Sequence, residues 1–290
     1  KFANASSRPG RLKIFGNTLA EVDSAVGTIM AALQAAGLES ESLVWVSADN
    51  GPADLGSVAC ESVGSPGPFV GGWQKRSRTS AGGGGGGGGT AKGTQWEGGH
   101  RVIGLAHWPG TVPAGVTTHA LAATIDVLPT MAALAGVPLP SDRHYDGMDL
   151  SNVLLSPSVT DAPNVTGRVL LHPHSATEIS AMRLGQYKVW FKTQGTEPCR
   201  RADGSHAAYD VSVQSHNPPL VFNLDSDPSE TFPLSPNSPE AARIARTATA
   251  TLQQWWNDVN ATLQGHTDYS TDPQDRPCSN PKSSCCRLKN

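Results

Sequence analysis

Apolar residues recur at every third or fourth position near the start of the chain, which predicts an amphipathic helix. The apolar stripe consists of Leu19, Val22, Val26, Ile29, Met30 and Leu33. Thr18 with Glu21 fits a capping box at the start, and Gly37 is placed to end the helix. The next apolar run, Leu43–Val46, has no polar face, so it predicts a parallel strand buried between helical layers. A helix followed by a buried strand is half of an α/β repeat.

The pattern continues beyond residue 100. "VIGLAHWPG" (102–110) predicts a second strand that ends in a turn, and "LAATIDVLPTMAALAG" (121–136) predicts a helix with Gly136 at its end. Near Gly167 the pattern changes to four short β-prone runs, and Gly185-Gln186 suits a two-residue hairpin. These runs are "RVLLH" (168–172), "ISAMRL" (179–184), "YKVWFK" (187–192) and "PLVFNL" (219–224). Ser238-Pro239-Glu240 then opens a last helix, so this half predicts a small α+β subdomain.

An octaglycine tract, Gly82–Gly89, lies inside a long irregular region. Glycine loses the most backbone entropy on folding, so we expect a linker inserted in a surface loop. The alternative is a phosphate-binding glycine loop. That loop would need a strand before it, a helix after it and a Lys-Ser/Thr pair, and none of these is in place.

The composition narrows the classes of function. A net charge of -3 over 290 residues leaves no basic footprint for nucleic acid, so we expect no nucleic-acid partner. No apolar run reaches the length that spans a bilayer, so we expect a soluble chain with no membrane contact. The chain starts at Lys1 without a signal-like segment, which points to a mature or truncated chain.

Cysteines and glycosylation signals bear on the cellular compartment. The five cysteines include no CxxC pair, and three N-x-S/T sequons begin at Asn4, Asn164 and Asn260. Together with the terminal cysteine cluster they favour a lysosomal or secreted glycoprotein with disulfides. Zinc is the competing interpretation of "PCSNPKSSCC", but the second ligand pair is missing. The odd number of cysteines leaves one over.

Asp49 and Asn50 follow directly after the first apolar run, at the edge of the sheet where α/β proteins bind ligands. A carboxylate and an amide carbonyl are hard oxygen donors, suited to Ca²⁺ or Mg²⁺. The alternative is an Asx turn that closes the strand. Two side chains cannot fill a site that needs six or more oxygens, so further ligands would have to come from elsewhere.

"KGTQWEGGHR" (92–101) is the second candidate segment. Lys92 lies between glycine-rich stretches and could present a cation to an anion, or it could be an ordinary solvated lysine. Glu97 could be a buried partner for Arg101. The aromatic residues and histidines of this region have no catalytic or metal-ligand spacing, so we expect them to pack or to be structural. They are Trp96, Trp108, His100 and His107.

The ordered set of motifs resembles the sulfatase family, and within it the arylsulfatase branch. The motifs are "VSADNGP", "GPFVGGWQ", "AKGTQWEGGHRV", "HWPG", "DVLPTMAALAG", "DGMDLSNVL", "LLHPHS", "MRLGQYKVWF" and "PLVFNLDSDPSE". The resemblance covers nearly the whole chain and implies the C-terminal part of an alkaline-phosphatase-like sheet sandwiched by helices. Residues 1–166 would belong to the catalytic domain, and residues 167–290 would form the α+β subdomain with an antiparallel sheet.

The resemblance also implies roles for individual residues. Asp49 and Asn50 would bind the active-site Ca²⁺, Lys92 would contact the sulfate, and Cys60 would pair with Cys199. The family's formylglycine is made in a C/S-x-P-x-R motif that lies far upstream, near the start of the catalytic domain. Ser7–Arg11 matches this motif only formally, because the segment lies just ahead of the helix that leads to Asp49. We therefore expect the formylglycine and the remaining metal ligands to lie upstream of this chain, which alone would be inactive.

The leading hypothesis is a calcium-dependent sulfuric ester hydrolase acting on aryl sulfates or sulfated glycans. A second hypothesis is a non-catalytic secreted module that binds sulfated glycans. A third is a related metal-dependent phosphohydrolase or phosphonohydrolase.

Overall fold

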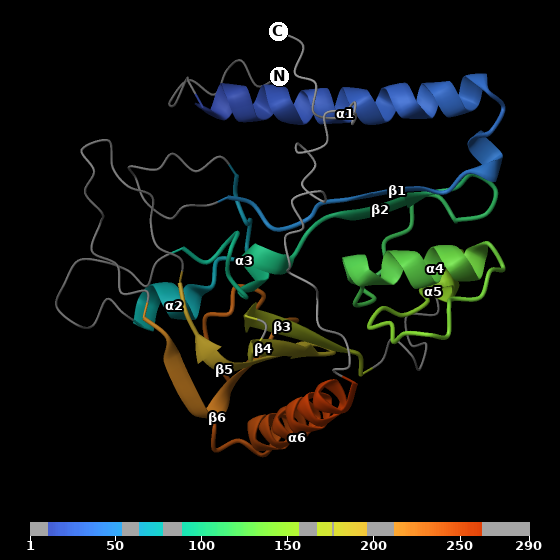
Figure 1. The fold of residues 1–290 in the computed structure, drawn as a ribbon. Helices are drawn as coiled ribbons and strands as arrows, with labels where there is room; N and C mark the ends of the chain where they lie inside the picture. Colours follow the sequence, from blue (N-terminus) through green and yellow to red (C-terminus); the bar gives the residue numbers. More distant parts are fainter. Residues whose placement is uncertain are drawn as a thin grey trace, which may run out of the picture. The chain divides into compact units, whose positions relative to one another are not determined.

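A computed structural model describes residues 11–53, 64–77, 89–156, 167–175, 177–195 and 212–262 (Figure 1). By its internal contacts the chain divides into two compact units, residues 1–248 and 249–290. All five cysteines, the sequons at Asn4 and Asn164, and Gly82–Gly88 lie outside the described residues. The disulfides, these glycosylation sites and the linker role of the glycine tract therefore stay predictions, as does a domain division at residue 166.

The predicted first helix is present as α1 (Arg11–Ala35). Gly37 ends it with φ +70°, and the Leu38 N–H donates to the Leu33 carbonyl at 2.9 Å, the hydrogen bond of a glycine C-cap. The predicted start is wrong, because the helix is already formed at Arg11 and Thr18 lies inside it. Part of the apolar stripe, including Leu19 and Val22, is about half exposed.

The first apolar run forms β1 (Val44–Ser47), which follows the short 3-10 helix η2 (Glu39–Glu41). β1 pairs with β2 (Gly104–His107) in an antiparallel two-stranded sheet, with Val44 opposite His107. The prediction of a buried parallel strand is therefore wrong for this pair, and β1 is only half-buried. An apolar run predicts burial but carries no information on the direction of the neighbouring strand.

The helix predicted at residues 121–136 is shorter than the pattern suggested. It is present as η4 (Thr124–Asp126) followed by α4 (Val127–Leu134), and α5 (Ser151–Leu155) lies further along the chain. Gly136 has φ +65°, as expected for the residue that ends α4. The buried carboxylate of Asp126 forms a bidentate ion pair with Arg168, at the start of the next strand, and accepts the backbone N–H of Ala123 and of Met148.

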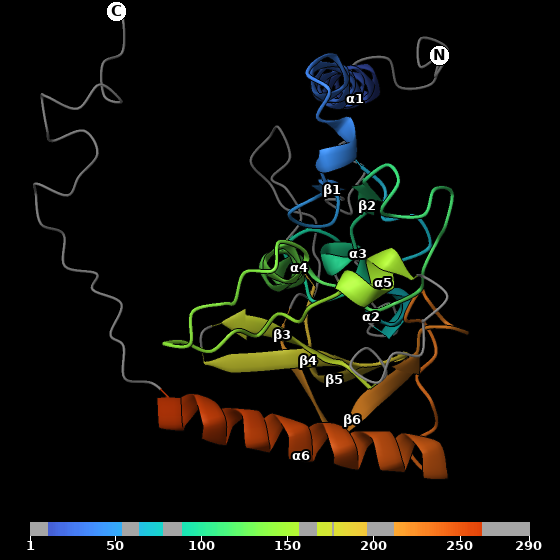
Figure 2. The ribbon, with the colours of Figure 1, turned by 90° about the vertical axis from the view of Figure 1, so that its right-hand side faces the viewer.

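All four β-prone runs are strands, and they form one antiparallel sheet in the order β3-β4-β5-β6 (Figure 2). The strands are β3 (Val169–Ser175), β4 (Glu178–Leu184), β5 (Tyr187–Thr193) and β6 (Gln214–Asn223). Gly185-Gln186 forms the predicted hairpin, with Leu184 opposite Tyr187 and Gly185 at φ +54°. Two short helices, α2 (Gly72–Ser77) and α3 (Glu97–His100), precede this sheet in the sequence.

A core of aromatic residues joins this sheet to the segment that leads into α3. It consists of Trp96, Ala181, Trp190, Phe222 and Leu224, with Trp73 and Leu220 packed against it. The rings of Trp96 and Trp190 have centroids 4.0 Å apart. The prediction that Trp96 is a packing residue is confirmed, because its side chain is fully buried.

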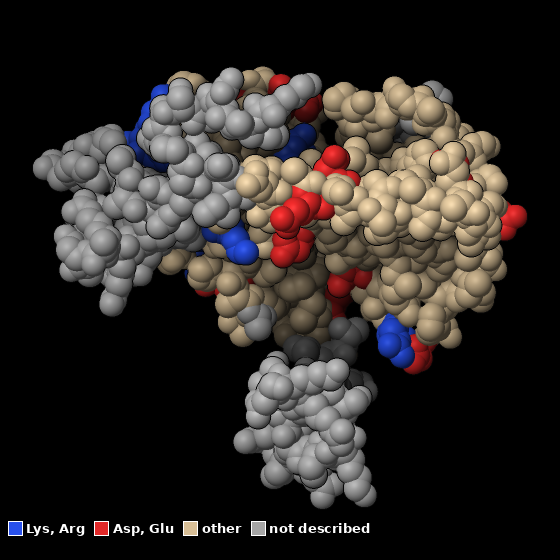
Figure 3. All heavy atoms as spheres, turned by 90° about the horizontal axis from the view of Figure 1, so that it is seen from above, with Lys and Arg blue, Asp and Glu red and all other residues tan. Residues whose placement is uncertain are grey.

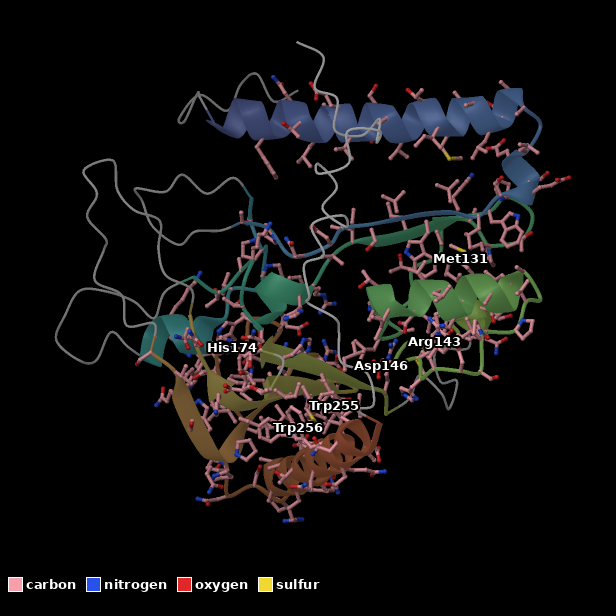
Figure 4. The ribbon with its side chains drawn as sticks, in the orientation of Figure 1. Met131, Arg143, Asp146, His174, Trp255 and Trp256 are labelled. Carbon is pink, nitrogen blue, oxygen red and sulfur yellow. The ribbon has the colours of Figure 1, made fainter. Side chains whose placement is uncertain are left out.

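The last helix, α6 (Pro239–Thr262), begins where the sequence predicts. The Ser238 hydroxyl accepts the Ala241 N–H at 3.1 Å, and the Tyr187 hydroxyl of β5 donates to Glu240. In the second unit, the adjacent rings of Trp255 and Trp256 have centroids 4.7 Å apart (Figure 4). Asn260, the one sequon asparagine within the described residues, is exposed there.

On the face in Figure 3, several acidic side chains form a group near the centre, and the basic side chains lie apart from one another among neutral atoms. Among the described helices, none combines the length and the apolar character that crossing a membrane requires.

Candidate functional site

Asp49 and Asn50 lie just beyond the carboxyl end of β1, as the sequence predicts. Asp49 is exposed, and Asn50 is half-buried with its Nδ2 donating to the Gly51 carbonyl at 2.8 Å. An Asx turn by Asp49 would take the Gly51 N–H, but that group donates to the Gly99 carbonyl at 2.8 Å. The Asp49 carboxylate makes no hydrogen bond or ion pair with any residue that the structure describes.

The segment that carries Lys92 lies against this strand end. The Lys92 N–H donates to the Pro52 carbonyl at 3.0 Å, so the segments 49–52 and 92–99 are joined by two backbone hydrogen bonds. The contact is so close that a side chain at Gly51 would collide with the carbonyl oxygen of Gly98. The Lys92 side chain is exposed, and within the described part of the chain it has no ion-pair partner. The structure thus joins the two segments that carry the three predicted site residues.

Glu97, at the start of α3, is the centre of a cluster of charges behind the Lys92 segment. Its Oε1 lies 3.0 Å from Lys188 Nζ, and its Oε2 lies 2.9 Å from Arg183 Nη1. The predicted pair with Arg101 is confirmed, but at 3.5 Å it is the longest of the three. Burial alone raises the pKa of Glu97, but the charges of Lys188 and Arg183 outweigh it and lower that pKa to about 2. Glu97 is therefore ionised in a nearly dry environment.

Glu230 is a second buried carboxyl group beside this cluster. Its Oε2 accepts the Glu97 N–H at 2.7 Å, and its Oε1 accepts Trp190 Nε1–H at 2.9 Å. Burial raises the pKa of Glu230 to about 7, with Lys188 opposing the shift and the Glu97 carboxylate adding to it. The two acids differ because Glu97 has cations in direct contact and Glu230 has only N–H donors.

Two histidine rings meet at the C-terminal end of α3. His100 and His172 have ring centroids 4.4 Å apart, and His172 is buried with its Nε2 lacking a hydrogen-bond partner. Burial lowers the pKa of both imidazoles, and Lys188 adds to the effect. His107, the last residue of β2, has its Nε2 3.7 Å from Oε1 of Glu39.

The donors in the chain suit a hard cation but do not complete its site. Asp49 and Asn50 supply one carboxylate and one amide, the donor types that Ca²⁺ prefers. Among the described residues no group of three or more histidine, cysteine, aspartate or glutamate side chains could hold a metal. The residues present therefore fit calcium in kind, but they are fewer than the six or more oxygens that it needs.

The sequence-based interpretation did not include Lys188, Arg183, Glu230 and His172. One signal for Lys188 was available, because in the strand "YKVWFK" it shares a face with the apolar Trp190. A lysine on the apolar face of a strand needs a buried acid as a partner. No comparable signal exists for Glu230, which lies in an irregular segment after β6 and has a positive φ of 50°.

Comparison with known proteins places these motifs in context. The family model of the sulfatases matches residues 4–137, and that of the C-terminal region of aryl-sulfatase matches residues 166–288. Arylsulfatase G of Rattus norvegicus is 37% identical over 98% of this chain, and that of Canis lupus familiaris is 40% identical over 95%. Human arylsulfatase A is 36% identical over 76%. The chain covers 50%, 48% and 38% of these three relatives, so it spans at most about half their length.

Solved structures agree in fold. The sulfatase PsFucS1 from Pseudoalteromonas sp. is 29% identical with a TM-score of 0.56 and covers 81% of this chain, which spans 42% of it. A second structure, Ps i-CgsB, is 21% identical with a TM-score of 0.60 over 87% of this chain and 44% of its own, and it supports the fold alone. With both family models matching in order and relatives of this identity along nearly its whole length, the chain belongs to the sulfatase family.

Proposed function

We propose that this chain is part of a calcium-dependent sulfatase that hydrolyses sulfate esters. The observation that carries the proposal is the pair of backbone hydrogen bonds, Gly51 to Gly99 and Lys92 to Pro52. They hold on adjoining segments a carboxylate and an ammonium group that have no partner among the described residues. A cation site beside a lysine is the arrangement that can bind a sulfate group and stabilise charge on it.

In this proposal Asp49 and Asn50 hold Ca²⁺ together with ligands from outside the 290 residues. A bound divalent cation supplies positive charge that stabilises the oxygens of a transferring sulfuryl group. Lys92 binds a sulfate oxygen with its ammonium group. Its exposed, flexible side chain reaches the sulfate, while its backbone stays fixed to Pro52.

The nucleophile of the proposed reaction is a formylglycine that lies outside this chain, so the 290 residues alone are expected to be inactive. The formal motif match at Ser7–Arg11 lies almost entirely outside the described residues, and only Arg11, the first residue of α1, is described.

The substrate class and location follow from the relatives as part of the proposal. Some relatives carry names that refer to sulfated sugars, such as N-acetylgalactosamine-6-sulfatase, and others are arylsulfatases. We propose an aryl sulfate or a sulfated glycan as substrate. A lysosomal or secreted location agrees with the exposed sequon at Asn260, where an N-glycan would have access.

The test is a chimera in which the part of rat arylsulfatase G that precedes the matched region is joined to this chain. Its turnover of 4-methylumbelliferyl sulfate is compared with that of Asp49→Ala and Lys92→Ala. Each substitution should lower kcat/KM by roughly 100-fold or more, because each removes charge stabilisation that the reaction needs. Lys192→Ala is the control, since Lys192 pairs with Glu178 on the sheet surface and should leave kcat/KM unchanged. Full turnover by Asp49→Ala would rule out the metal assignment.

The same chimera separates the alternative functions. A phosphohydrolase or phosphonohydrolase would turn over 4-methylumbelliferyl phosphate faster than the sulfate. A non-catalytic module would bind immobilised heparin through the 290-residue chain and turn over neither ester.

A further inference from the structure

The Lys92 segment depends on the four-stranded sheet for its path. Residues 91–96 form only turns and bends, so no regular element fixes them. Instead, Gln95 Nε2 donates to the Pro173 carbonyl of β3 at 3.2 Å, and Trp96 Nε1 donates to the Gln194 carbonyl at 3.1 Å. The next residue, Glu97, bonds to the sheet through its side chain. Three consecutive residues therefore anchor the segment to strands that come much later in the chain.

The glycines of α3 contact the turn after β1, next to Asp49, so the position of α3 also determines the position of this turn. The Gly51 N–H donates to the Gly99 carbonyl, and the two backbones approach so closely that a side chain at Gly51 would collide with the carbonyl oxygen of Gly98. A contact of this kind tolerates little movement, because there is no side chain between the two backbones to adjust. A tilt of α3 would therefore displace both the Gly51 turn and Lys92.

The position of α3 is fixed by hydrogen bonds, which have a preferred direction. The Glu97 carboxylate accepts one hydrogen bond from Lys188 and one from Arg183, while the Glu97 N–H donates to Glu230. A buried ion pair is a weak source of stability compared with apolar packing of the same volume, but charge-assisted hydrogen bonds fix orientation. The cluster thus determines the direction in which α3 and its glycines point.

We propose that Glu97 and Glu230 are positioning residues that hold α3 so that Lys92 and the Asp49–Asn50 turn stay together. The role of Lys92 in this inference rests on the proposed function, but the geometric claim does not. Neither glutamate is assigned contact with the substrate. Each acts through α3 and the glycine contact.

The test is hydrogen exchange of the backbone amides in the 290-residue chain, for the wild type, Glu97→Gln and Glu230→Gln. Protection of the Gly51 and Lys92 amides should fall by roughly tenfold or more in both variants, because these N–H groups lose their fixed acceptors when α3 moves. The amides of the β4–β5 ladder should keep their protection. Glu178→Gln is the matched control, since it removes the carboxylate of the half-buried Lys192 pair on the same two strands and should change neither set.

A double variant separates positioning from stability alone. Glu97→Gln with Lys188→Met removes the carboxylate and the more deeply buried of its two cations, so the unfolding temperature should return part of the way toward that of the wild type. The Gly51 and Lys92 amides should still lack protection, because the directional bonds are gone. Protection that returns together with stability, or that is never lost in the single variants, would overturn the inference.

Turnover in the chimera distinguishes this inference from the proposed function. If Lys92→Ala leaves kcat/KM unchanged, the proposed function fails, whatever the exchange data show. If Lys92→Ala abolishes turnover while Glu97→Gln and Glu230→Gln do not lower it, the positioning role fails and the proposed function stands.

Discussion

Glu230 is a buried carboxyl group whose protonation is coupled to folding. Burial raises its pKa from 4.5 to about 7, so between these values the folded chain keeps a proton that the unfolded chain releases. Its contribution to stability is therefore fully present below about pH 4.5 and is lost as the pH rises through about 7. The lowered pKa of Glu97 acts in a separate range, since its contribution is lost only as the pH falls from 4.5 toward 2.

Glu230→Gln isolates this effect, because glutamine stays neutral at every pH. The wild type should exceed the variant in unfolding temperature most clearly near pH 5, and the difference should shrink as the pH rises to about 7.5. Folding also lowers the pKa of His100 and His172, but it does so in both proteins, so their contributions cancel in the difference. Calorimetry at four or five pH values measures it, with Glu178→Gln as the control. A difference that does not vary with pH would contradict the prediction.

At the scale of residues, local spacing identified some of the site and could not identify the rest. Arg101 is four residues from Glu97, so its pairing was within reach of a local argument. Lys188 and Arg183 lie 91 and 86 residues from Glu97 in sequence, so only the folded sheet brings them together. Spacing alone offered Asp49 and Lys92 as separate candidates, and only the family resemblance implied one site for both. The backbone contact that joins their segments has no signature beyond glycine content.

At the scale of elements, the ion pair of Asp126 and Arg168 fastens the short helix η4 to the start of β3. Both side chains are buried, and Arg168 also donates to the Leu121 carbonyl at 2.9 Å. Removal of one partner leaves the other as a buried, uncompensated charge.

Asp126→Ala should therefore lower the free energy of unfolding by about 3 kcal/mol or more. Asp126→Leu combined with Arg168→Met should recover much of this loss, because no charge then remains unpaired. Urea denaturation at pH 7 provides the measurement. Asp142→Ala is the control, because the Asp142–Arg143 pair is exposed and its loss should leave stability unchanged. A similar loss in the single and the double variant would show that packing, rather than charge, is what Asp126 contributes.

The bounds of helices and strands were predicted best where a glycine or an alternating apolar pattern determined them. Gly37, Gly136 and Gly185 all have positive φ at the predicted helix ends and hairpin, because their backbone needs a conformation that other residues rarely adopt. The start of α1 was predicted wrongly because a capping motif inside a longer helix has the same sequence as one at its end. The direction of the strand beside β1 was predicted wrongly, because strand direction is decided by tertiary contacts.

At the scale of the whole molecule, buried contacts join the two regions that the sequence analysis predicted on either side of residue 166. Trp96 packs against Trp190 and Phe222, and Glu97 pairs with Lys188. The family and the fold class could be predicted from the order of many motifs, since each motif alone is short. The calcium site stays a prediction, and it includes a shortage of ligands, because such a site needs more oxygens than two side chains offer.

That shortage leads to a prediction for the 290-residue chain by itself. With one carboxylate and one amide, it should bind Ca²⁺ no more tightly than the weakest protein sites, with a Kd of about 1 mM or higher. At 0.1 mM Ca²⁺ the stabilisation would then be at most about 0.06 kcal/mol, so the unfolding temperature should not change. In the chimera, additional ligands should give a clear increase that Asp49→Ala abolishes. Calorimetry with and without calcium tests both proteins. Tight binding by the isolated chain that Asp49→Ala removes would mean that the chain itself supplies further calcium ligands.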